Sequence, residues 1–192
     1  MKEIFADIYE KERWGKGRGS GPGSSLFSNK KYIPFLENFL RDNNITSVID
    51  FGCGDWQFSQ YIDWGDIDYL GLDVVDSVIE NNKKQFPEYS FVSDTDVFKY
   101  LSDRKLIIIK DVLMHWPDEE IESFLDKLTK YNIWILLINS AVNQPIKRKL
   151  KVGGWSPLEY DKLPLKKYDS ELIFTFRNRQ VVLIKLLEGF ME

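Results

Sequence analysis

Hydrophobic residues along this chain alternate between a pattern typical of strands and one typical of helices. Short apolar runs predict strands at about 47–52, 69–74, 89–93, 105–110 and 132–139. Helical spacing predicts helices near 56–63, 76–86 and 117–130. Residues 106–109 and 133–138 are apolar at every position, which indicates strands that are covered on both faces. The pattern therefore predicts a parallel sheet in a doubly wound α/β fold.

Near the C-terminus the pattern becomes that of a hairpin. Apolar runs at 172–176 and 181–186 flank the loop 177–180, and two strands joined by so short a loop are antiparallel. We therefore expect a mostly parallel sheet that ends in an antiparallel C-terminal hairpin. The length of 192 residues suits one core and no internal repeat is visible, so we expect a single domain over 1–192.

The first 31 residues stand apart from the α/β core that we expect over 32–192. Residues 14–25 are too rich in glycine and serine for regular structure, and that composition is typical of a flexible tail. The segment also carries Trp14 and leads directly into a helix predicted at 32–44, so an ordered lid is the alternative.

Composition excludes several functional classes. Hydrophobic residues make up 43% and charged residues 29% of the chain, as in ordinary globular proteins. No apolar run approaches membrane-spanning length and the N-terminus has no signal core, so we expect no membrane partner. A single cysteine cannot form an internal disulfide or a cysteine-based metal site, which favours the cytoplasm and no metal. A net charge of −4 argues against a nucleic-acid partner.

The most specific motif is an Asp-x-Gly-x-Gly turn after the first predicted strand. Asp50 precedes Gly52 and Gly54, and Asp73 ends the next strand. Glycines at such a turn let a ligand approach the backbone, and the later acid can accept hydrogen bonds from ribose hydroxyls. A dinucleotide fingerprint needs a third glycine where this chain has Gln57. The turn therefore predicts a site for an adenosine-containing ligand that is not a dinucleotide.

This turn with its two acids resembles motif I of class I S-adenosylmethionine-dependent methyltransferases. Nearly the whole chain is similar to a subgroup of small bacterial members of that family. The similar segments are 14–15, 20–24, 49–59, 69–75, 110–117 and 153–155. The resemblance implies a seven-stranded sheet whose last strand is antiparallel, with S-adenosylmethionine as donor and S-adenosylhomocysteine as product. It also implies an N-terminal segment that folds over the donor or the acceptor.

Polar residues after the fourth predicted strand are the candidates for chemistry. Ligands of open α/β sheets bind beyond the carboxyl ends of the strands, so we expect Asp111 and His115 to face the glycine turn. His115 could act as general base for an alcohol acceptor. Asp111 could orient the imidazole or bind the amino group of the donor. A structural role fits each residue about equally well, and a phosphate or carboxylate acceptor would need no base.

The expected site residues fall into three groups. The catalytic candidates are His115 and Asp111. The cofactor-binding candidates are Asp50, Gly52, Cys53, Gly54, Trp56, Asp73, Val74, Asp94, Lys110 and Asp111. The substrate-binding candidates are Trp14, Arg18, Ser20, Gly21, His115 and Trp155. Asp94 could accept a hydrogen bond from the adenine amino group, with Asp96 as competitor.

Two further features bear on the acceptor. Trp14, Trp56, Trp116 and Trp155 could form aromatic walls around it, and the basic residues at 147–149 and 151 could hold a phosphate. Relatives tend to carry an arginine and then an Asp-Leu pair after the Gly-Gly-aromatic, where this chain continues Ser156-Pro157-Leu158-Glu159. If that arginine binds the acceptor in relatives, we expect a different acceptor here.

We expect O-methylation of a small hydroxyl or phosphate-type acceptor, such as a nucleotide-linked sugar or a surface-polysaccharide precursor. One alternative is a methyltransferase-like binding protein without catalysis. The other is an NAD-dependent oxidoreductase, although the missing third glycine argues against it. Either a monomer or a homodimer is compatible with the sequence.

Overall fold

The computed structural model describes residues 2–15, 17, 19–94, 96–101, 106–140, 150 and 154–186. The strands form one seven-stranded sheet in the order β3-β2-β1-β4-β5-β7-β6. It is the mostly parallel α/β sheet with an antiparallel C-terminal hairpin that the sequence predicts. Contacts divide the chain into two compact units, Met1–Tyr100 and Leu101–Glu192, and each is described by itself.

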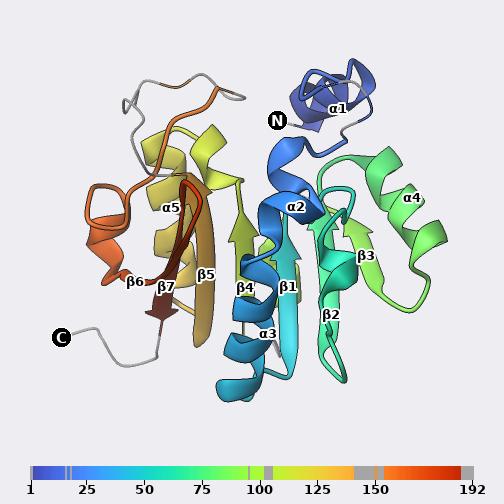
Figure 1. Ribbon diagram of the computed structural model, residues 1–192. Helices are drawn as coiled ribbons and strands as arrows, with labels where there is room; N and C mark the ends of the chain where they lie inside the picture. The colour runs from blue at the N-terminus through green and yellow to red at the C-terminus, as the bar shows by residue number, and fades with distance from the viewer. Residues whose placement is uncertain are drawn as a thin grey trace. The chain divides into compact units, whose positions relative to one another are not determined.

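The first unit holds three parallel strands with helices beside them (Figure 1). Its strands are β1 (Ser47–Phe51), β2 (Asp68–Asp73) and β3 (Ser90–Ser93). Its helices are α1 (Lys2–Glu10), α2 (Leu26–Asn29), α3 (Tyr32–Asp42) and α4 (Asp76–Gln85). Its 3-10 turns are η1 (Pro22–Ser24), η2 (Ser59–Tyr61) and η3 (Val97–Tyr100). In Figure 1, α1 lies beyond the carboxyl ends of these three strands.

The apolar pattern explains how this unit packs. Every residue of β1 is buried, Ser47 and Asp50 included, so this strand is covered on both faces. On α3, the buried residues Tyr32, Leu36 and Leu40 recur every four positions and so form one face. The helix predicted over 32–44 is therefore confirmed, and it buries one face in the core.

The helix predicted near 56–63 is wrong. This segment is a set of turns with the short η2 inside it. Trp56 has a φ of 58°, a left-handed conformation that a right-handed helix does not continue. The indole of Trp64 donates to the carbonyl oxygen of Ser59 at 3.0 Å, which fixes the loop from inside. Burial of two tryptophans thus overrides a weak helical pattern.

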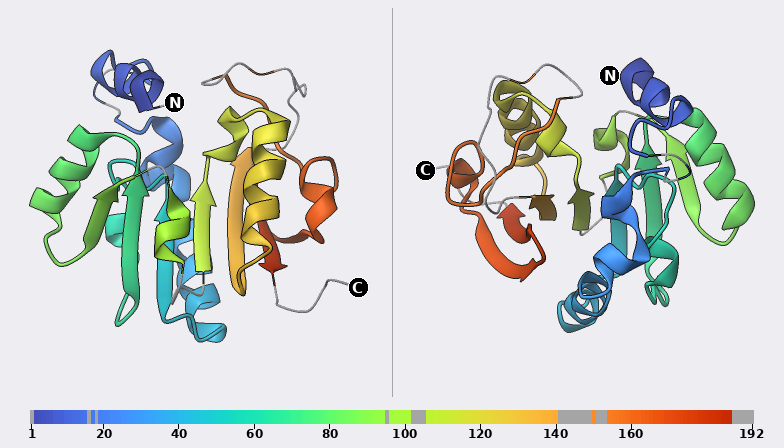
Figure 2. Two further views of the ribbon diagram at one scale, coloured as in Figure 1. Left: turned by 180° about the vertical axis from the view of Figure 1, so that it is seen from behind. Right: turned by 45° about the horizontal axis from the view of Figure 1, so that its top comes forward.

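The second unit contains the other four strands and the predicted C-terminal hairpin. Its strands are β4 (Leu106–Lys110), β5 (Ile133–Ser140), β6 (Glu171–Phe176) and β7 (Arg179–Leu186). Its helix is α5 (Asp118–Leu128), and its 3-10 turns are η4 (Leu113–His115) and η5 (Leu165–Tyr168). α5 begins directly after Pro117, as expected of a proline that precedes an acidic first turn. Figure 2 shows α5 against one face of β5.

The hairpin turn is shorter than the sequence predicts. Residues 177–180 were expected to form the loop, but β7 already begins at Arg179, so only Arg177 and Asn178 lie between the strands. Arg177 has a φ of 54°, which two-residue hairpin turns commonly require. Arg179 is therefore a strand residue, paired with Ser140 at the end of β5.

None of the helices in the described ranges combines the length and the apolarity that crossing a membrane requires.

Candidate functional site

The glycine turn of the first unit continues the pairing of β1 with β2. The backbone N–H groups of Gly52 and Cys53 both donate to the carbonyl oxygen of Leu72, at 2.8 and 3.0 Å. Gly52 and Gly54 have φ values of 83° and 57°, which glycine adopts without strain. The two glycines therefore allow the backbone of the turn to adopt positive φ values.

Asp73 holds this turn to the end of β2. Its Oδ2 accepts from the backbone N–H of Gly54 at 3.0 Å, and its Oδ1 accepts from that of Val75 at 3.0 Å. Burial raises the pKa of Asp73 above its ordinary value, although both backbone N–H groups act to lower it. The side chain remains half-buried, at the end of the strand.

Asp50 is tied into the core. The hydroxyl of Tyr69 donates to Asp50 Oδ2 at 2.9 Å, and the indole N–H of Trp56 donates to the Tyr69 oxygen at 2.7 Å. Trp56 is only 2% exposed and packs against Phe86 and Phe91. The Trp56 side chain is therefore a core group, and only its backbone borders the turn.

Two further residues, Asn82 and Cys53, pack against the glycine turn, and the sequence pattern does not identify Asn82. Asn82 of α4 is fully buried, and its Nδ2 donates to the carbonyl oxygen of Gly54 at 2.8 Å. Cys53 fills space left by Gly71, where a Cβ would lie 3.1 Å from the Cys53 sulfur. Burial raises the pKa of the Cys53 thiol, so the side chain stays protonated and acts in packing.

The N-terminal segment closes over the turn through Ser20. Ser20 Oγ accepts from the backbone N–H of Asp55 at 2.9 Å and shares a 2.6 Å hydrogen bond with the Tyr9 hydroxyl. The Ser20 N–H in turn donates to Asp55 Oδ2 at 3.1 Å. A Cβ on Gly54 would lie 2.2 Å from Ser20 Oγ, so this segment covers that side of Gly54. The described part of residues 19–25 is thus in contact with the glycine turn.

Three other predicted residues belong to this segment. Trp14 is half-buried and makes an edge contact with Tyr9, with ring centroids 5.4 Å apart. Gly21 has a φ of 86°, and a Cβ there would lie 3.1 Å from Trp14 Cβ, so Trp14 and Gly21 pack together. Arg18 lies outside the described residues. The helix α1, which carries Tyr9, was not predicted.

Asp94 and Val74 lie at the ends of β3 and β2. Asp94 accepts from Lys99 Nζ at 2.9 Å, from the Tyr100 hydroxyl at 3.0 Å and from the backbone N–H of Asp96 at 2.9 Å. The backbone hydrogen bond from Asp96 and the Lys99 contact lower the pKa of Asp94 well below its usual range. Val74 is half-buried in the bend after β2. A role of Asp94 in adenine binding stays a prediction.

The polar residues of the second unit gather around Asp111. Its carboxylate accepts from Lys110 Nζ at 2.6 Å and from Arg179 at 3.0–3.2 Å through Nε and Nη2. The Lys110 and Arg179 side chains are 6% and 11% exposed, and that of Asp111 is 21% exposed. Although burial acts against it, the two cations lower the pKa of Asp111, which stays ionised.

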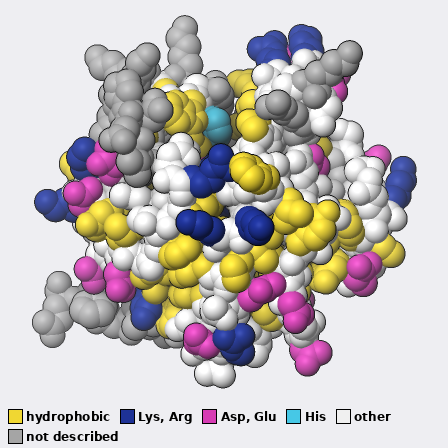
Figure 3. Space-filling view, viewed as in Figure 1, with side chains coloured by type: hydrophobic (Ala, Val, Ile, Leu, Met, Phe, Trp, Pro, Cys, Tyr) yellow, Lys and Arg dark blue, Asp and Glu magenta, His cyan; other side chains and the backbone are white. Residues whose placement is uncertain are grey.

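His115 is held by a backbone carbonyl. Its Nδ1 lies 2.7 Å from the carbonyl oxygen of Gly154. A carbonyl only accepts, so Nδ1 carries a proton and Nε2 is the basic nitrogen of the neutral ring. Burial lowers the pKa of His115 below its usual 6.5, while Asp111 acts in the opposite direction. The imidazole is thus neutral at pH 7, and it is visible at the surface in Figure 3.

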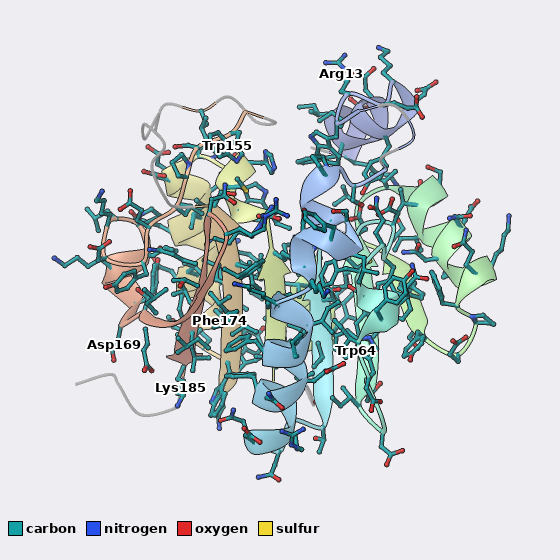
Figure 4. The ribbon with its side chains drawn as sticks, in the orientation of Figure 1. Arg13, Trp64, Trp155, Asp169, Phe174 and Lys185 are labelled. Carbon is teal, nitrogen blue, oxygen red and sulfur yellow. The ribbon has the colours of Figure 1, made fainter. Side chains whose placement is uncertain are left out.

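The chain segment after Gly154 is anchored to the same end of the unit. The backbone N–H of Ser156 donates to the carbonyl oxygen of Met114 at 3.0 Å, and that of Leu158 donates to Ser140 at 3.3 Å. Trp155, which directly follows Gly154, is 40% exposed and is labelled in Figure 4.

The proposed aromatic walls are partly wrong. Trp56 and Trp116 are 2% and 9% exposed and are core residues, which leaves Trp14 and Trp155 as candidates. The basic residues at 147–149 and 151 lie outside the described residues.

An adenosine-type ligand fits the residues of the glycine turn. Each carboxylate oxygen of Asp73 takes one backbone N–H and has a second lone pair for a ribose hydroxyl. Asp55 Oδ1 is buried without a hydrogen-bond partner in the described part of the chain, so a ligand donor could satisfy it. The turn therefore offers acceptors of the kind that a nucleoside requires.

Comparisons with known proteins show which fold this is. No protein-family model matches the sequence, and comparison with curated proteins finds no match. Among solved structures, magnesium protoporphyrin IX methyltransferase (ChlM) from Synechocystis PCC 6803 with bound SAH aligns with a TM-score of 0.65 and 15% identity. The alignment covers 96% of this chain and 99% of that chain.

Two further solved structures have similar folds. The methyltransferase domain of bacterial CtHen1-CN aligns with a TM-score of 0.62 and 17% identity, over 82% of this chain and 99% of that chain. The bifunctional kinase-methyltransferase WbdD aligns with a TM-score of 0.60 and 19% identity, over 82% of this chain and 39% of that chain. The chain therefore has the fold of class I S-adenosylmethionine-dependent methyltransferases, as its sequence motifs predict.

Proposed function

We propose that this protein is an S-adenosylmethionine-dependent methyltransferase that produces S-adenosylhomocysteine. The observation that carries the proposal is the link between the Gly54 N–H and the Asp73 carboxylate, at 3.0 Å, within a class I methyltransferase fold. ChlM, which shares this fold, has been crystallised with both S-adenosylmethionine and S-adenosylhomocysteine.

The donor supplies an electrophilic methyl group, and the chain's own residues bind and orient it. Asp73 would accept hydrogen bonds from the ribose hydroxyls, and the backbone of Gly52 and Gly54 would border the donor. Asp50 would act indirectly, because Tyr69 holds its carboxylate in the core beneath the turn. Ser20 and Tyr9 would close the N-terminal segment over the bound donor.

His115 is the proposed general base for a hydroxyl acceptor. Its Nδ1–H is engaged by Gly154, and its neutral ring can take the hydroxyl proton on Nε2. Gly154, and not Asp111, is the group that orients the ring through a hydrogen bond. Asp111 instead pairs with two cations, which argues against a primary role in binding the donor amino group.

The acceptor that we propose is a small hydroxyl or phosphate-type compound, such as a nucleotide-linked sugar or a surface-polysaccharide precursor. The support is the resemblance of the motifs to small bacterial methyltransferases and the exposed Trp155 next to the His115 partner Gly154. Aromatic faces of this kind suit sugars and apolar rings. We propose a cytoplasmic protein that acts as a monomer or a homodimer.

Calorimetric titration with S-adenosylmethionine, S-adenosylhomocysteine and NAD tests the proposal. We expect micromolar binding of the first two and none of NAD, since the turn lacks the third glycine that a diphosphate requires. Binding of NAD alone would overturn the donor assignment in favour of an oxidoreductase. Donor binding without methyl transfer to any acceptor would instead favour a non-catalytic binding protein.

A further inference from the structure

Arg179 has hydrogen-bonding capacity that its contacts in the protein do not use. Nε and Nη2 of its guanidinium donate to the Asp111 carboxylate at 3.0–3.2 Å, so one edge of the group is fixed by a two-point contact. A guanidinium has five N–H donors. Among the described residues only Asp111 accepts from Arg179, so the Nη1 donors are left over.

The unused end of the guanidinium is accessible to a ligand. The Arg179 side chain is 11% exposed, so most of it lies within the protein. The exposed 11% shows that part of the side chain still meets solvent, and Arg179 has no atom among the fully buried polar atoms that lack a hydrogen-bond partner in the described part of the chain. A largely desolvated guanidinium that keeps one accessible end binds oxyanions tightly, because its planar N–H groups match two oxygens at once.

The register of the strands brings Arg179 to the ligand-binding end of its unit. Arg179 opens β7 opposite Ser140, the last residue of β5, while Lys110 ends β4 opposite Ile138. Ligands of open α/β sheets bind at the carboxyl ends of parallel strands, and β4 and β5 both end here. Asp111 directly follows β4, and His115 ends η4, the 3-10 turn that comes next in the chain. The accessible end of Arg179 and the proposed base thus belong to one cluster.

We propose that Arg179 binds an anionic group of the methyl acceptor, a phosphate or a carboxylate, and so restricts the substrates to anionic compounds. This inference rests on the proposed methyltransferase function. Asp111 is then a positioning residue, which holds the guanidinium so that Nη1 and the remaining Nη2 donor point outward. Asp111 has a left-handed backbone, with a φ of 55°, and its carboxylate contacts Arg179.

Binding of inorganic phosphate tests the proposal without knowledge of the acceptor. The wild-type protein, Arg179→Gln and Arg179→Lys are titrated with phosphate at constant ionic strength, with chloride as the competing salt. We expect saturable binding by the wild type, and a loss of about 10- to 100-fold in Arg179→Gln. Arg179→Lys should recover part of the affinity, because a point charge remains while the fork is lost.

The matched control is Arg177→Gln, two residues away in the exposed hairpin turn. It removes the same charge and should bind phosphate as the wild type does. Equal loss in both glutamine variants would reveal a general charge effect and overturn the proposal, as would unchanged binding in Arg179→Gln. Unfolding midpoints measured without phosphate show whether Arg179→Gln has lost its fold. If it has, the phosphate affinity of Arg179→Lys decides whether the proposal holds.

A second pair of titrations separates an acceptor site from a donor site. S-adenosylhomocysteine carries an α-carboxylate, whereas 5′-methylthioadenosine has the same nucleoside without the amino-acid part. We expect Arg179→Gln to bind both as the wild type does. Weaker binding of S-adenosylhomocysteine alone would assign Arg179 to the donor carboxylate and overturn the proposal. If the wild type bound neither nucleoside, the proposed function would fail, while the phosphate titration would still judge the anion site.

Discussion

The two polar clusters of this protein are built in different ways. Around the glycine turn, the contacts are hydrogen bonds within one part of the sequence: Gly54 to Asp73 and Tyr69 to Asp50 span 19 residues each, and Ser20 to Asp55 spans 35. Around Asp111, the contacts are ion pairs, one with the adjacent Lys110 and one with Arg179, which lies 68 residues away. The first cluster therefore fixes a backbone conformation, while the second brings charged side chains together.

This difference matches the two tasks that we propose. A donor common to many enzymes can be held by a backbone shape, which glycines and their neighbours specify locally. An acceptor particular to one enzyme requires charges placed by tertiary structure, and an arginine brought in by the last hairpin is such a device. We therefore expect substitutions in the first cluster to affect donor binding, and substitutions in the second to affect turnover and acceptor choice.

Replacing His115 should have the largest effect and should leave the first cluster untouched. We expect His115→Ala to lower kcat on a hydroxyl acceptor by about 10²- to 10⁴-fold, the range for loss of a general base. Affinity for S-adenosylhomocysteine should stay at the wild-type value. Single-turnover kinetics and calorimetry measure the two quantities, and full activity would show that the acceptor is already ionised or that another base acts.

The pH dependence of the wild-type enzyme sharpens the same test. Burial lowers the pKa of His115 below 6.5, so the base is neutral at pH 7 and becomes protonated only at lower pH. The rate should therefore be flat above about pH 6.5 and fall as the pH drops below it. If the rate of His115→Gln still falls at low pH, that fall must be assigned to another titrating group.

Replacing Asp73 should break the first cluster alone. We expect Asp73→Ala to weaken donor binding by about 100-fold or more, because two hydrogen bonds from ribose to a charged acceptor are lost. Asp76→Ala is the matched control, since it removes the same charge three residues later from a side chain that is 59% exposed. Calorimetry measures the donor affinity of both variants. Equal affinities would contradict the ribose assignment.

The first cluster was predictable because its signals are local. A short, mostly apolar run identified β1, and Gly52 and Gly54, whose φ values are positive, identified the turn. Asp73 followed from its position at the end of the second run. Such features depend on neighbours in sequence, so they can be recognised without tertiary structure.

The second cluster was only half predictable. Asp111 and His115 follow a predicted strand, but Arg179 was assigned to a loop, because its partner lies 68 residues away. Two-residue turns are the commonest hairpin connections, and this preference could have moved Arg179 into the strand. The helix expected at 56–63 was wrong for a related reason: burial of Trp56 in an aromatic core decides the fold there.

Replacing Tyr69 tests whether the core contacts of the first cluster support its stability. In Tyr69→Phe, the indole N–H of Trp56 and the carboxylate of Asp50 both lose a buried partner. We expect the free energy of unfolding to fall by about 1–3 kcal/mol. Urea denaturation measures it, and Tyr61→Phe, at a residue 54% exposed, should change it little. Equal effects in the two variants would show that the buried chain of hydrogen bonds adds nothing.

Replacing Ser20 should have the smallest effect and should tell whether the N-terminal segment closes on the turn independently of the rest. Ser20 Oγ accepts from the backbone N–H of Asp55, so this amide is protected only while the segment is closed. In Ser20→Ala we expect its hydrogen exchange to quicken by about fivefold, as the loss of one hydrogen bond of about 1 kcal/mol implies. The global free energy of unfolding should stay near that of Ser90→Ala, a control at an exposed serine. Quickened exchange throughout β1 would instead mean that Ser20 stabilises the whole unit, and the segment would then be part of the core of the first cluster.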